Sequence, residues 1–294
     1  MAGSTQESDR RGQIKLTSTQ ETLLITLYSR WQDFYSPRPL LGDRWSAEAM
    51  ERVLEQTTEA RSRTRGGMVS GLPLLVLRAR LFDEWTAEFL AENERATVVH
   101  LACGLDTRAL RLRDRCGPGV TWIDVDFPDV IELRRRMEIP EPRRAADGYS
   151  YDMVASSVVD AGWLDSLPAG KPTLVIFEGL TMYLSPDEGR GLIRRLLGRF
   201  GTGQLVFDSV STASRFVLNT VPGVKGLWTF KFDWAIDDPG ALCASCPGLV
   251  LATSLRLWDM PGLERLPWPM RLAAFVASWI PILRDVSRMN RFNF

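Results

Sequence analysis

The chain has 294 residues, of which 45% are hydrophobic, and its 36 basic residues balance 36 acidic ones, so its formal net charge is zero. This composition supports a large buried core and makes a nucleic-acid partner unexpected. The longest apolar run, 272–283, is shorter than the ~20 residues that a membrane-spanning helix needs. The polar N-terminal stretch lacks the apolar segment of a signal peptide, so we expect a cytoplasmic protein.

Four cysteines are too few for a disulfide framework in a chain of this length. Cys243 and Cys246 form a single Cys-x-x-Cys pair, with no second pair and no histidine nearby. His100 is the only histidine, and it lies inside an apolar run where we expect it to pack in the core. The chain is therefore not expected to bind a metal ion.

The first third of the chain has helical periodicity. Residues 1–16 are polar and charged, and we expect them to be disordered. Ser18, with a glutamate three residues later, starts a capping box, which predicts a helix that ends before Pro37. Two further helices are expected, one opening at Ser46 and one over 74–90.

From residue 97 the pattern changes to alternating strands and helices. The candidate strands lie at 97–102, 120–125, 151–157, 172–178, 203–209, 248–258 and 289–294. Several of them are almost continuously apolar, as parallel strands covered on both faces are. Ser185, Pro186 and Glu188 form a strong helix start between the fourth and fifth strands. The arginine run 134–136 is interpreted as a solvated helix face.

The turn after the first candidate strand indicates a nucleoside site. A short apolar run ends in Ala102–Gly104, and about twenty residues later a second run ends in Asp124 and Asp126. In a doubly wound sheet such a turn admits a ligand to the backbone, and the acid binds ribose hydroxyls. Dinucleotides require three glycines in the turn, whereas only Gly104 is present, which favours S-adenosylmethionine as the cofactor. Asp124 competes with Asp126 for the ribose because both lie on one strand face.

Two charged residues are candidates for the methionine end of this cofactor. Arg78 or Arg80, on the helix before the first strand, can pair with its carboxylate; the alternative is a plain surface residue. Glu178 follows the fourth strand, at the edge where such sheets bind ligands. Buried behind apolar residues, Glu178 needs a partner, and the ligand's ammonium is one. The alternative is that it caps the N–H groups of Gly179 or Leu180.

Four segments together resemble the leucine carboxyl methyltransferase family and its polyketide O-methyltransferase branch: Leu101–Arg108, Asp124–Pro128, Phe177–Leu184 and Glu21–Arg30. The resemblance runs from about residue 17 to about residue 260, in order. It implies a Rossmann-like class I methyltransferase fold with a seven-stranded, mostly parallel sheet and an N-terminal helical lid. It also implies that Arg78 pairs with the cofactor carboxylate, Asp126 binds the ribose and Glu178 lies beside the methionine.

On this basis we expect one domain over 17–294. Its predicted parts are a helical lid over 17–70, a cofactor-binding core over 71–210, and an acceptor-side insertion with the last strands over 211–294. The predicted cofactor-binding residues are Arg78, Ala102, Gly104, Asp126, Ser157, Val158 and Glu178.

Two positions depart from the family pattern. Ala102 stands where the family usually has glycine, and its methyl group is tolerated without strain only if its φ is negative. Ser157-Val158 stands where the family tends to have Asp-Leu, with the acid on the adenine. Ser157 can still hydrogen-bond the adenine edge, and Asp160 is a substitute if the register shifts.

The sequence indicates no general base near the expected cleft. A carboxylate acceptor needs none, and an acidified enol or phenol needs little help, so these are the favoured acceptors. The predicted acceptor-binding residues are Tyr28, Arg30, Tyr183, Phe232 and Trp234, and the first three are also candidates for a catalytic role. At least one of Tyr28 and Arg30 is expected to face the acceptor from the lid helix.

The first hypothesis is an S-adenosylmethionine-dependent O-methyltransferase of a small polyketide-like natural product, with this acceptor as its partner. The second is a protein of the same fold that does not transfer methyl groups and acts as a pericyclase or an accessory pathway protein. The departures at Ala102 and Ser157 motivate it. A dinucleotide oxidoreductase is disfavoured by the single glycine. The sequence permits an oligomer without indicating one.

Overall fold

The computed structural model describes residues 18–56, 73–142, 149–220 and 231–294. The expected disorder of residues 1–16 lies outside this part of the chain. So do 57–70 of the expected lid and part of the insertion, at 221–230.

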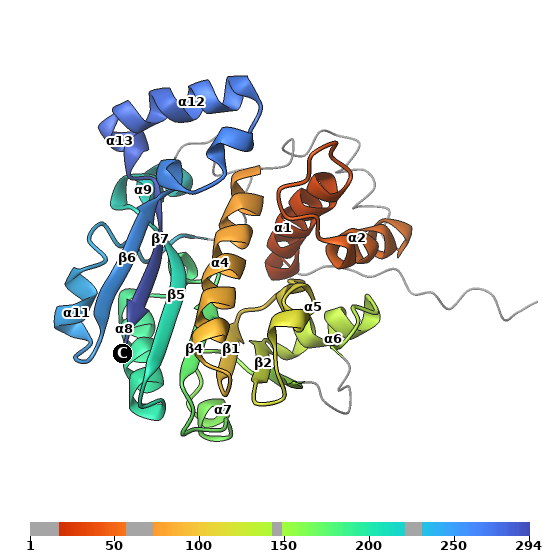
Figure 1. Ribbon diagram of the computed structural model, residues 1–294. Coiled ribbons are helices and arrows are strands. Elements are labelled where there is room, and N and C mark those ends of the chain that lie inside the picture. Colours follow the sequence, from red (N-terminus) through yellow and green to blue (C-terminus); the bar gives the residue numbers. More distant parts are fainter. Residues whose placement is uncertain (1–17, 57–72, 143–148, 221–230) are drawn as a thin grey trace, which may run out of the picture.

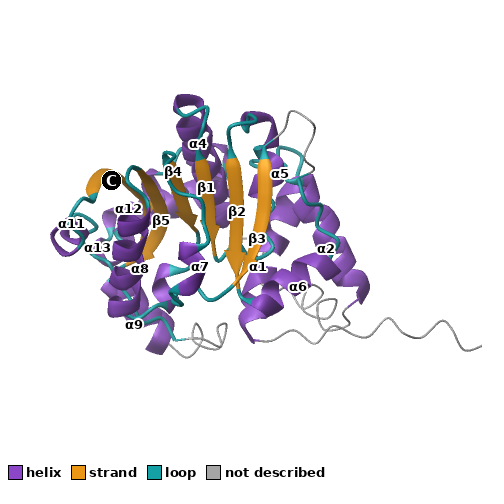
Figure 2. Cartoon of the chain, turned by 90° about the horizontal axis from the view of Figure 1, so that it is seen from below, coloured by secondary structure: helices purple, strands orange, loops and turns teal. Residues whose placement is uncertain are grey.

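All seven candidate strands are present, and they join into one sheet of order β3-β2-β1-β4-β5-β7-β6. Their bounds are β1 Thr97–Leu101, β2 Thr121–Asp126, β3 Ser150–Ala155, β4 Thr173–Phe177, β5 Gly203–Val210, β6 Val250–Arg256 and β7 Ser287–Asn293. The first five strands run parallel, whereas β7 is antiparallel to both β5 and β6. Figure 2 shows β3, β2 and β1 side by side with helices on both faces of the sheet. The predicted α/β fold with a mostly parallel seven-stranded sheet is confirmed.

The four helices predicted in the sequence, starting at Ser18, Ser46, residue 74 and Pro186, are present as α1, α2, α4 and α8, and each begins within two residues of its predicted start. The α-helices are α1 Ser18–Phe34, α2 Arg44–Gln56, α4 Pro73–Glu92, α5 Arg108–Arg111, α6 Pro128–Arg136, α7 Gly162–Asp165, α8 Pro186–Arg199, α9 Thr212–Thr220, α11 Ala241–Ser245, α12 Trp268–Trp279 and α13 Pro281–Arg284. The 3-10 helices are η1 Arg113–Arg115, η2 Thr181–Tyr183, η3 Leu257–Asp259 and η4 Leu263–Arg265. At the start of α8, Ser185 and Glu188 form the predicted reciprocal capping box.

Alternate residues of each central strand enter two different hydrophobic cores. Val99, Val175 and Leu205 pack with residues of α7, α8 and α11 on one face. Val98 and Leu174, next along their strands, pack against α4 on the other face. Because both faces are covered, the strands are apolar at almost every position, which is the pattern that identified them in the sequence.

A third core joins the N-terminal helices to the sheet. Leu24 and Leu27 of α1 and Met50 of α2 pack with Leu105 and with Leu133 of α6. Figure 1 shows α1, α9 and α12 at the same end of the sheet, which is the end where the five parallel strands finish. No helix in the described ranges is long and apolar enough to cross a membrane.

Candidate functional site

A cavity of about 490 Å³ lies at the carboxyl end of the parallel strands. This volume falls within the range of ligand sites in proteins, ~300–1,000 Å³. Its walls include the turn after β1, the ends of β2 and β4, and parts of α1, α4 and α9. The lining residues used below are Leu23, Arg30, Arg78, His100, Ala102, Gly104, Asp126, Glu178, Leu180, Met182, Tyr183, Leu218 and Phe232.

Gly104 occupies a position that strongly favours glycine. Its φ is +54°, in the left-handed region, and an added Cβ would lie 2.8 Å from Leu23 Cδ2 of α1. Its N–H donates to Asp126 Oδ2 at 2.7 Å. The glycine therefore brings the turn close both to the helix above it and to the acid at the end of β2.

Ala102 has a φ of +49°. Alanine at this position is free of strain only if its φ is negative. The φ is positive, because the turn bends the chain into the left-handed region. A Cβ in that region costs roughly 1–2 kcal/mol. The turn therefore contains a strained alanine on the cavity wall.

Replacing Ala102 with glycine is expected to raise the free energy of unfolding by roughly 0.5–1 kcal/mol, because the gain from relieved strain exceeds the entropy cost of glycine. Urea denaturation measures this. Ala161 is a matched control, since its φ is −85°; Ala161→Gly should lower the stability. A loss of stability in Ala102→Gly would contradict the strain.

The two candidate ribose acids have different surroundings. Asp124 is 1% exposed, and it accepts from Trp122 Nε1 at 2.9 Å, Tyr151 Oη at 2.8 Å and Arg134 Nη2 at 3.1 Å. Asp126 lines the cavity, and its carboxylate accepts from the N–H groups of Gly104 and Phe127, both at 2.7 Å. Each Asp126 oxygen keeps a free lone pair for a ligand hydroxyl. Of the two acids, Asp126 is the one available to a ribose.

Burial raises the pKa of Asp126, although the N–H groups of Gly104 and Phe127 and the charge of Arg134 act against it. We predict that cofactor affinity falls on acidification at a higher pH than an ordinary aspartate would cause, because the protonated acid accepts ribose hydroxyls less well. Calorimetry with S-adenosylhomocysteine from pH 8 down to pH 5 measures this. Asp126→Asn should bind weakly with little pH dependence. An equally steep pH dependence in that variant would assign the titration to another group.

Arg134 does not lie on the solvated face predicted for 134–136, and it stabilises the turn after β1. It is 4% exposed and donates to the carbonyl oxygens of Gly104 and Asp106 at 2.8 and 2.7 Å. Arg135 and Arg136 are exposed, as expected. Consecutive residues of a helix point in different directions, so one arginine of the run can be buried while its neighbours are exposed. The group that Arg134 binds, the turn after β1, lies 30 residues away in the chain, so the sequence alone does not reveal the contact.

Arg78 and Glu178 meet at the cavity wall. Arg78 Nε donates to Glu178 Oε1 at 3.1 Å and Arg78 Nη1 to Asp208 Oδ2 at 2.6 Å. Asp208 also accepts from the N–H of Gly179 at 2.6 Å. Arg78 is therefore not a plain surface residue, since only 11% of its side chain is exposed. Asp208, not Glu178, accepts from the N–H of Gly179. Asp208 carried no motif that could have identified it.

Arg108 holds Glu178 from the other side. It is fully buried and donates to Glu178 Oε2 at 2.7 Å and to Asp83 Oδ1 at 2.6 Å. Burial alone would raise the pKa of Glu178, but Arg78, Arg108 and Arg30 together lower it to about 2. Glu178 is therefore a permanent carboxylate and does not serve as a base near neutral pH.

These residues belong to one buried ionic network with an excess of negative charge. In the described part of the chain it contains five arginines and seven carboxylates: Arg30, Arg78, Arg108, Arg111, Arg134, Asp43, Asp83, Asp106, Asp124, Asp126, Glu178 and Asp208. His100 lies among them, 3.4 Å from Asp124 and 3.3 Å from Arg108. The surplus of carboxylates over arginines at the cavity wall fits a ligand that carries positive charge.

The helix α1 presents Arg30 to the cavity and Tyr28 away from it. Arg30 Nη2 donates to Asp106 Oδ2 at 3.0 Å and lies 3.7 Å from Glu178. Tyr28 stacks on Trp31, with ring centroids 5.4 Å apart, and packs on the third core. Of the two lid residues that the sequence proposed, the structure brings only Arg30 to the site.

The opposite end of the cavity is mainly apolar. Tyr183 and Phe232 stack there with ring centroids 5.4 Å apart, beside Leu180, Met182 and Leu218. Asn219 fixes Phe232 through both backbone groups, at 2.9 and 2.7 Å. Burial raises the pKa of Tyr183 to about 12, so its phenol stays neutral.

Besides Tyr28, three more of the proposed residues lie outside the cavity lining. Trp234 packs in the core beneath Gly189, where an added Cβ would overlap its ring. Val158 is buried in the same core, and its carbonyl accepts from Arg195 at 3.0 Å. The Ser157 hydroxyl accepts from the N–H of Val159 at 3.4 Å. The adenine role of Ser157 and Val158 remains a prediction.

The sheet order with its antiparallel seventh strand, the helices on both faces and the cavity at the carboxyl edge define a class I methyltransferase fold. Two solved structures share it: a protein of Thermobifida fusca assigned as a methyltransferase (TM-score 0.54, 13% identity, 84% of this chain and 93% of that one), and a DUF574 family protein of Streptomyces avermitilis (TM-score 0.57, 12% identity, 94% and 99%). Residues 36–197 match the leucine carboxyl methyltransferase family, and the chain belongs to that family.

Two relatives match almost the whole chain. The tetracenomycin polyketide synthesis O-methyltransferase TcmP of Streptomyces glaucescens is 38% identical over 282 residues, which cover 96% of this chain and 98% of that one. The S-adenosyl-L-methionine-dependent methyltransferase dpfgK of Gibberella zeae is 37% identical over 295 residues, covering 96% of each. The predicted class is thereby confirmed: the chain is an S-adenosylmethionine-dependent O-methyltransferase.

Proposed function

We propose that the chain methylates a carboxylate or an acidic hydroxyl of a small, polyketide-like natural product. The observation that supports this most is that one cavity joins an ionic end to an aromatic end. The ionic end holds Asp126, Arg78 and Glu178, and the aromatic end holds the stacked Tyr183 and Phe232. The relationship to a polyketide synthesis O-methyltransferase agrees with a polyketide-like acceptor.

The residues at the ionic end fit S-adenosylmethionine. Asp126 is proposed to bind the ribose diol, and Arg78 the amino-acid carboxylate, while Glu178 faces the ammonium group. The bound cofactor supplies an electrophilic methyl group on a positively charged sulfur. The excess of carboxylates in the ionic network stabilises that charge in a water-poor site.

The acceptor is expected to provide its own reactive oxygen anion. Glu178 has a pKa of about 2, and Tyr183 has one of about 12, so neither takes up a proton readily at neutral pH. Both ring nitrogens of His100 already contact other side chains: Nδ1 lies 3.4 Å from Asp124, and Nε2 lies 3.3 Å from Arg108. Carboxylates, enols and phenols of low pKa are ionised without help, and the apolar wall strips water from them.

The test is to incubate the protein with S-adenosylmethionine and a panel of aromatic carboxylic acids, acidic phenols and simple alkyl alcohols, and to record masses. A product heavier by one methyl group from the acidic acceptors supports the proposal. Methylation of the alkyl alcohols alone would contradict it. An isomer of unchanged mass would instead support the pericyclase-like alternative.

Phe232→Ala is expected to raise the KM for an aromatic acceptor about tenfold or more, because it removes one face of the aromatic end. Binding of S-adenosylhomocysteine should change little, since the ionic end is untouched. Steady-state kinetics and calorimetry measure the two. Phe216→Ala is a matched control, because Phe216 is 66% exposed and does not line the cavity. Equal losses in cofactor and acceptor binding would contradict this division of the cavity.

A further inference from the structure

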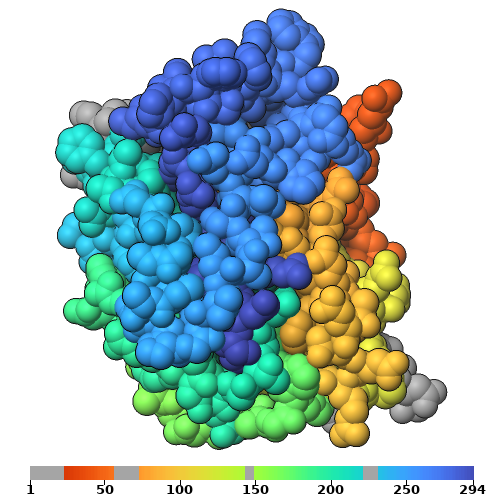
Figure 3. All heavy atoms as spheres, turned by 60° about the vertical axis from the view of Figure 1, so that its left-hand side comes forward, coloured from red at the N-terminus to blue at the C-terminus, as the bar shows by residue number. Residues whose placement is uncertain are grey.

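The helix α12 buries its small residues and exposes its large apolar ones, which is the opposite of a typical surface helix of a globular protein. Its small residues Ala274 and Ala277 are buried, each 8% exposed. Its large apolar residues face solvent: Trp268 is 72% exposed, Phe275 61% and Trp279 74%. Amphipathic surface helices turn their large apolar residues inward. Figure 3 shows this segment projecting at the top of the molecule.

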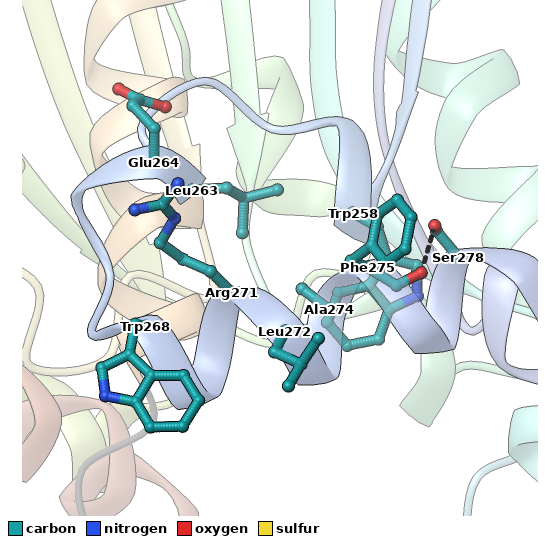
Figure 4. A pocket seen from close by; sticks show the side chains of 9 residues that line it. All are labelled: Trp258, Leu263, Glu264, Trp268, Arg271, Leu272, Ala274, Phe275 and Ser278. Atoms are coloured by element: carbon teal, nitrogen blue, oxygen red, sulfur yellow. Dashed lines mark hydrogen bonds between the residues drawn. The ribbon is translucent and has the colours of Figure 1, made fainter.

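These three residues form a continuous line with Leu272, which is 53% exposed. We call the four residues, Trp268, Leu272, Phe275 and Trp279, the outer stripe. Their spacing of four, three and four residues places them on one helix face. Figure 4 shows Trp268 and Leu272 projecting from α12, with Arg271 extending toward the η4 segment. A groove of about 550 Å³ flanks the stripe, walled on its other side by Trp258 and Leu263.

The exposed area is that of a protein interface. The three aromatic side chains expose about 400 Å² together, given ~150–250 Å² for each ring. The half-exposed Leu272, Val276, Ile280, Ile282 and Leu283 roughly double that area. The largest apolar patch on a typical monomer is ~300–600 Å², whereas each partner of a standard interface buries ~800 Å². The surface has the size of one half of a dimer interface.

We propose that the outer stripe pairs with the same stripe of a second copy of this chain, the two α12 helices lying antiparallel. The stripe reads the same from both ends, with a tryptophan four residues outside a central Leu272–Phe275 pair. Antiparallel pairing therefore sets each tryptophan against a tryptophan of the other copy, and Leu272 against Phe275. Such self-complementarity is what a two-fold interface requires.

The near absence of charged residues on α12 agrees with an apolar partner of this kind. Within α12 the only charged residue is Arg271, on the flank of the stripe, and there is no acidic residue. A partner of strong charge would find little to pair with along the stripe. The Ser278 hydroxyl donates to the carbonyl of Phe275 at 2.7 Å, so it needs no hydrogen-bond partner from another molecule.

The first test is the mass in solution, measured by sedimentation equilibrium over a range of concentrations. The wild-type protein is expected to reach twice the 33.1 kDa of one chain. Leu272→Arg should raise the dimer dissociation constant at least ~100-fold, because the change occurs twice in a two-fold interface. Val250→Arg is the control, since Val250 is 60% exposed on β6, and it should leave the dimer intact. S-adenosylhomocysteine binding by each variant verifies the fold.

The second test uses the antiparallel register. Phe275→Glu alone should also be monomeric, because it places a carboxylate against Leu272 of the other copy. Mixed with Leu272→Arg, it should restore a dimer in which the new Arg and Glu face each other. A mixture that stays monomeric contradicts the pairing. So does a wild-type protein that is monomeric at all concentrations, or that sediments with phospholipid vesicles instead, and so does a Leu272→Arg variant that remains a dimer.

Discussion

Asp126→Ala is expected to weaken the binding of S-adenosylhomocysteine by on the order of 100-fold or more. In the proposed binding mode the ribose diol loses two hydrogen bonds to a buried carboxylate, and each is worth ~1.5–3 kcal/mol. The turn also loses its anchor, because Asp126 holds the N–H groups of Gly104 and Phe127 at 2.7 Å. Calorimetry measures the affinity directly.

The matched control for this variant is Asp152→Ala. Asp152 is an exposed aspartate on the neighbouring strand β3, and its carboxylate contacts only the N–H of Met153 among the contacts described. It should bind as the wild-type protein does. Undiminished binding in Asp126→Ala would remove Asp126 from the ribose and reopen the question for the other acids of the network.

Arg108→Met is expected to lower the free energy of unfolding by about 3–5 kcal/mol, the cost of leaving buried charges without their partner. Arg108 is fully buried and is bonded to Asp83, Glu178 and His100. Urea denaturation measures the loss, and soluble expression reports it if the variant no longer folds. Methionine nearly fills the volume of the arginine stem, so the effect comes from the charge.

Arg115→Met provides the comparison, because Arg115 is exposed on η1 a few residues further along the chain. Its effect should stay within about 0.5 kcal/mol. Arg108→Lys should fall between the two, since a lysine keeps the charge but cannot reach three partners with one ammonium group. A loss below about 1 kcal/mol in Arg108→Met would show that the network tolerates unpaired carboxylates.

The strands and helices were predictable because each depends on local patterns. Parallel strands covered on both faces are continuously apolar, and the capping box before α8 contains its own partners. The single glycine of the turn and the acid at the end of β2 were predictable for the same reason, since their spacing is a property of one β-α-β unit.

The partners within the site could not be read from the sequence. Arg108 reaches Asp83 and Glu178, which are 25 and 70 residues away, and only the folded chain brings them together. The strain at Ala102 is a matter of backbone angle, which its identity does not reveal. On α12 the apolar spacing is visible in the sequence, but the spacing does not say that the large residues face outward.

The place of β7 in the sheet has a consequence for how the chain folds during synthesis. In the described sheet β6 borders only β7, and β7 follows it along the chain by way of α12 and α13. β5 and β6 therefore each keep an unpaired edge until residues 287–293 have been added and lie between them. Unpaired strand edges invite pairing with other chains. A chain that stops before residue 287 is therefore expected to give less soluble protein than the full-length chain.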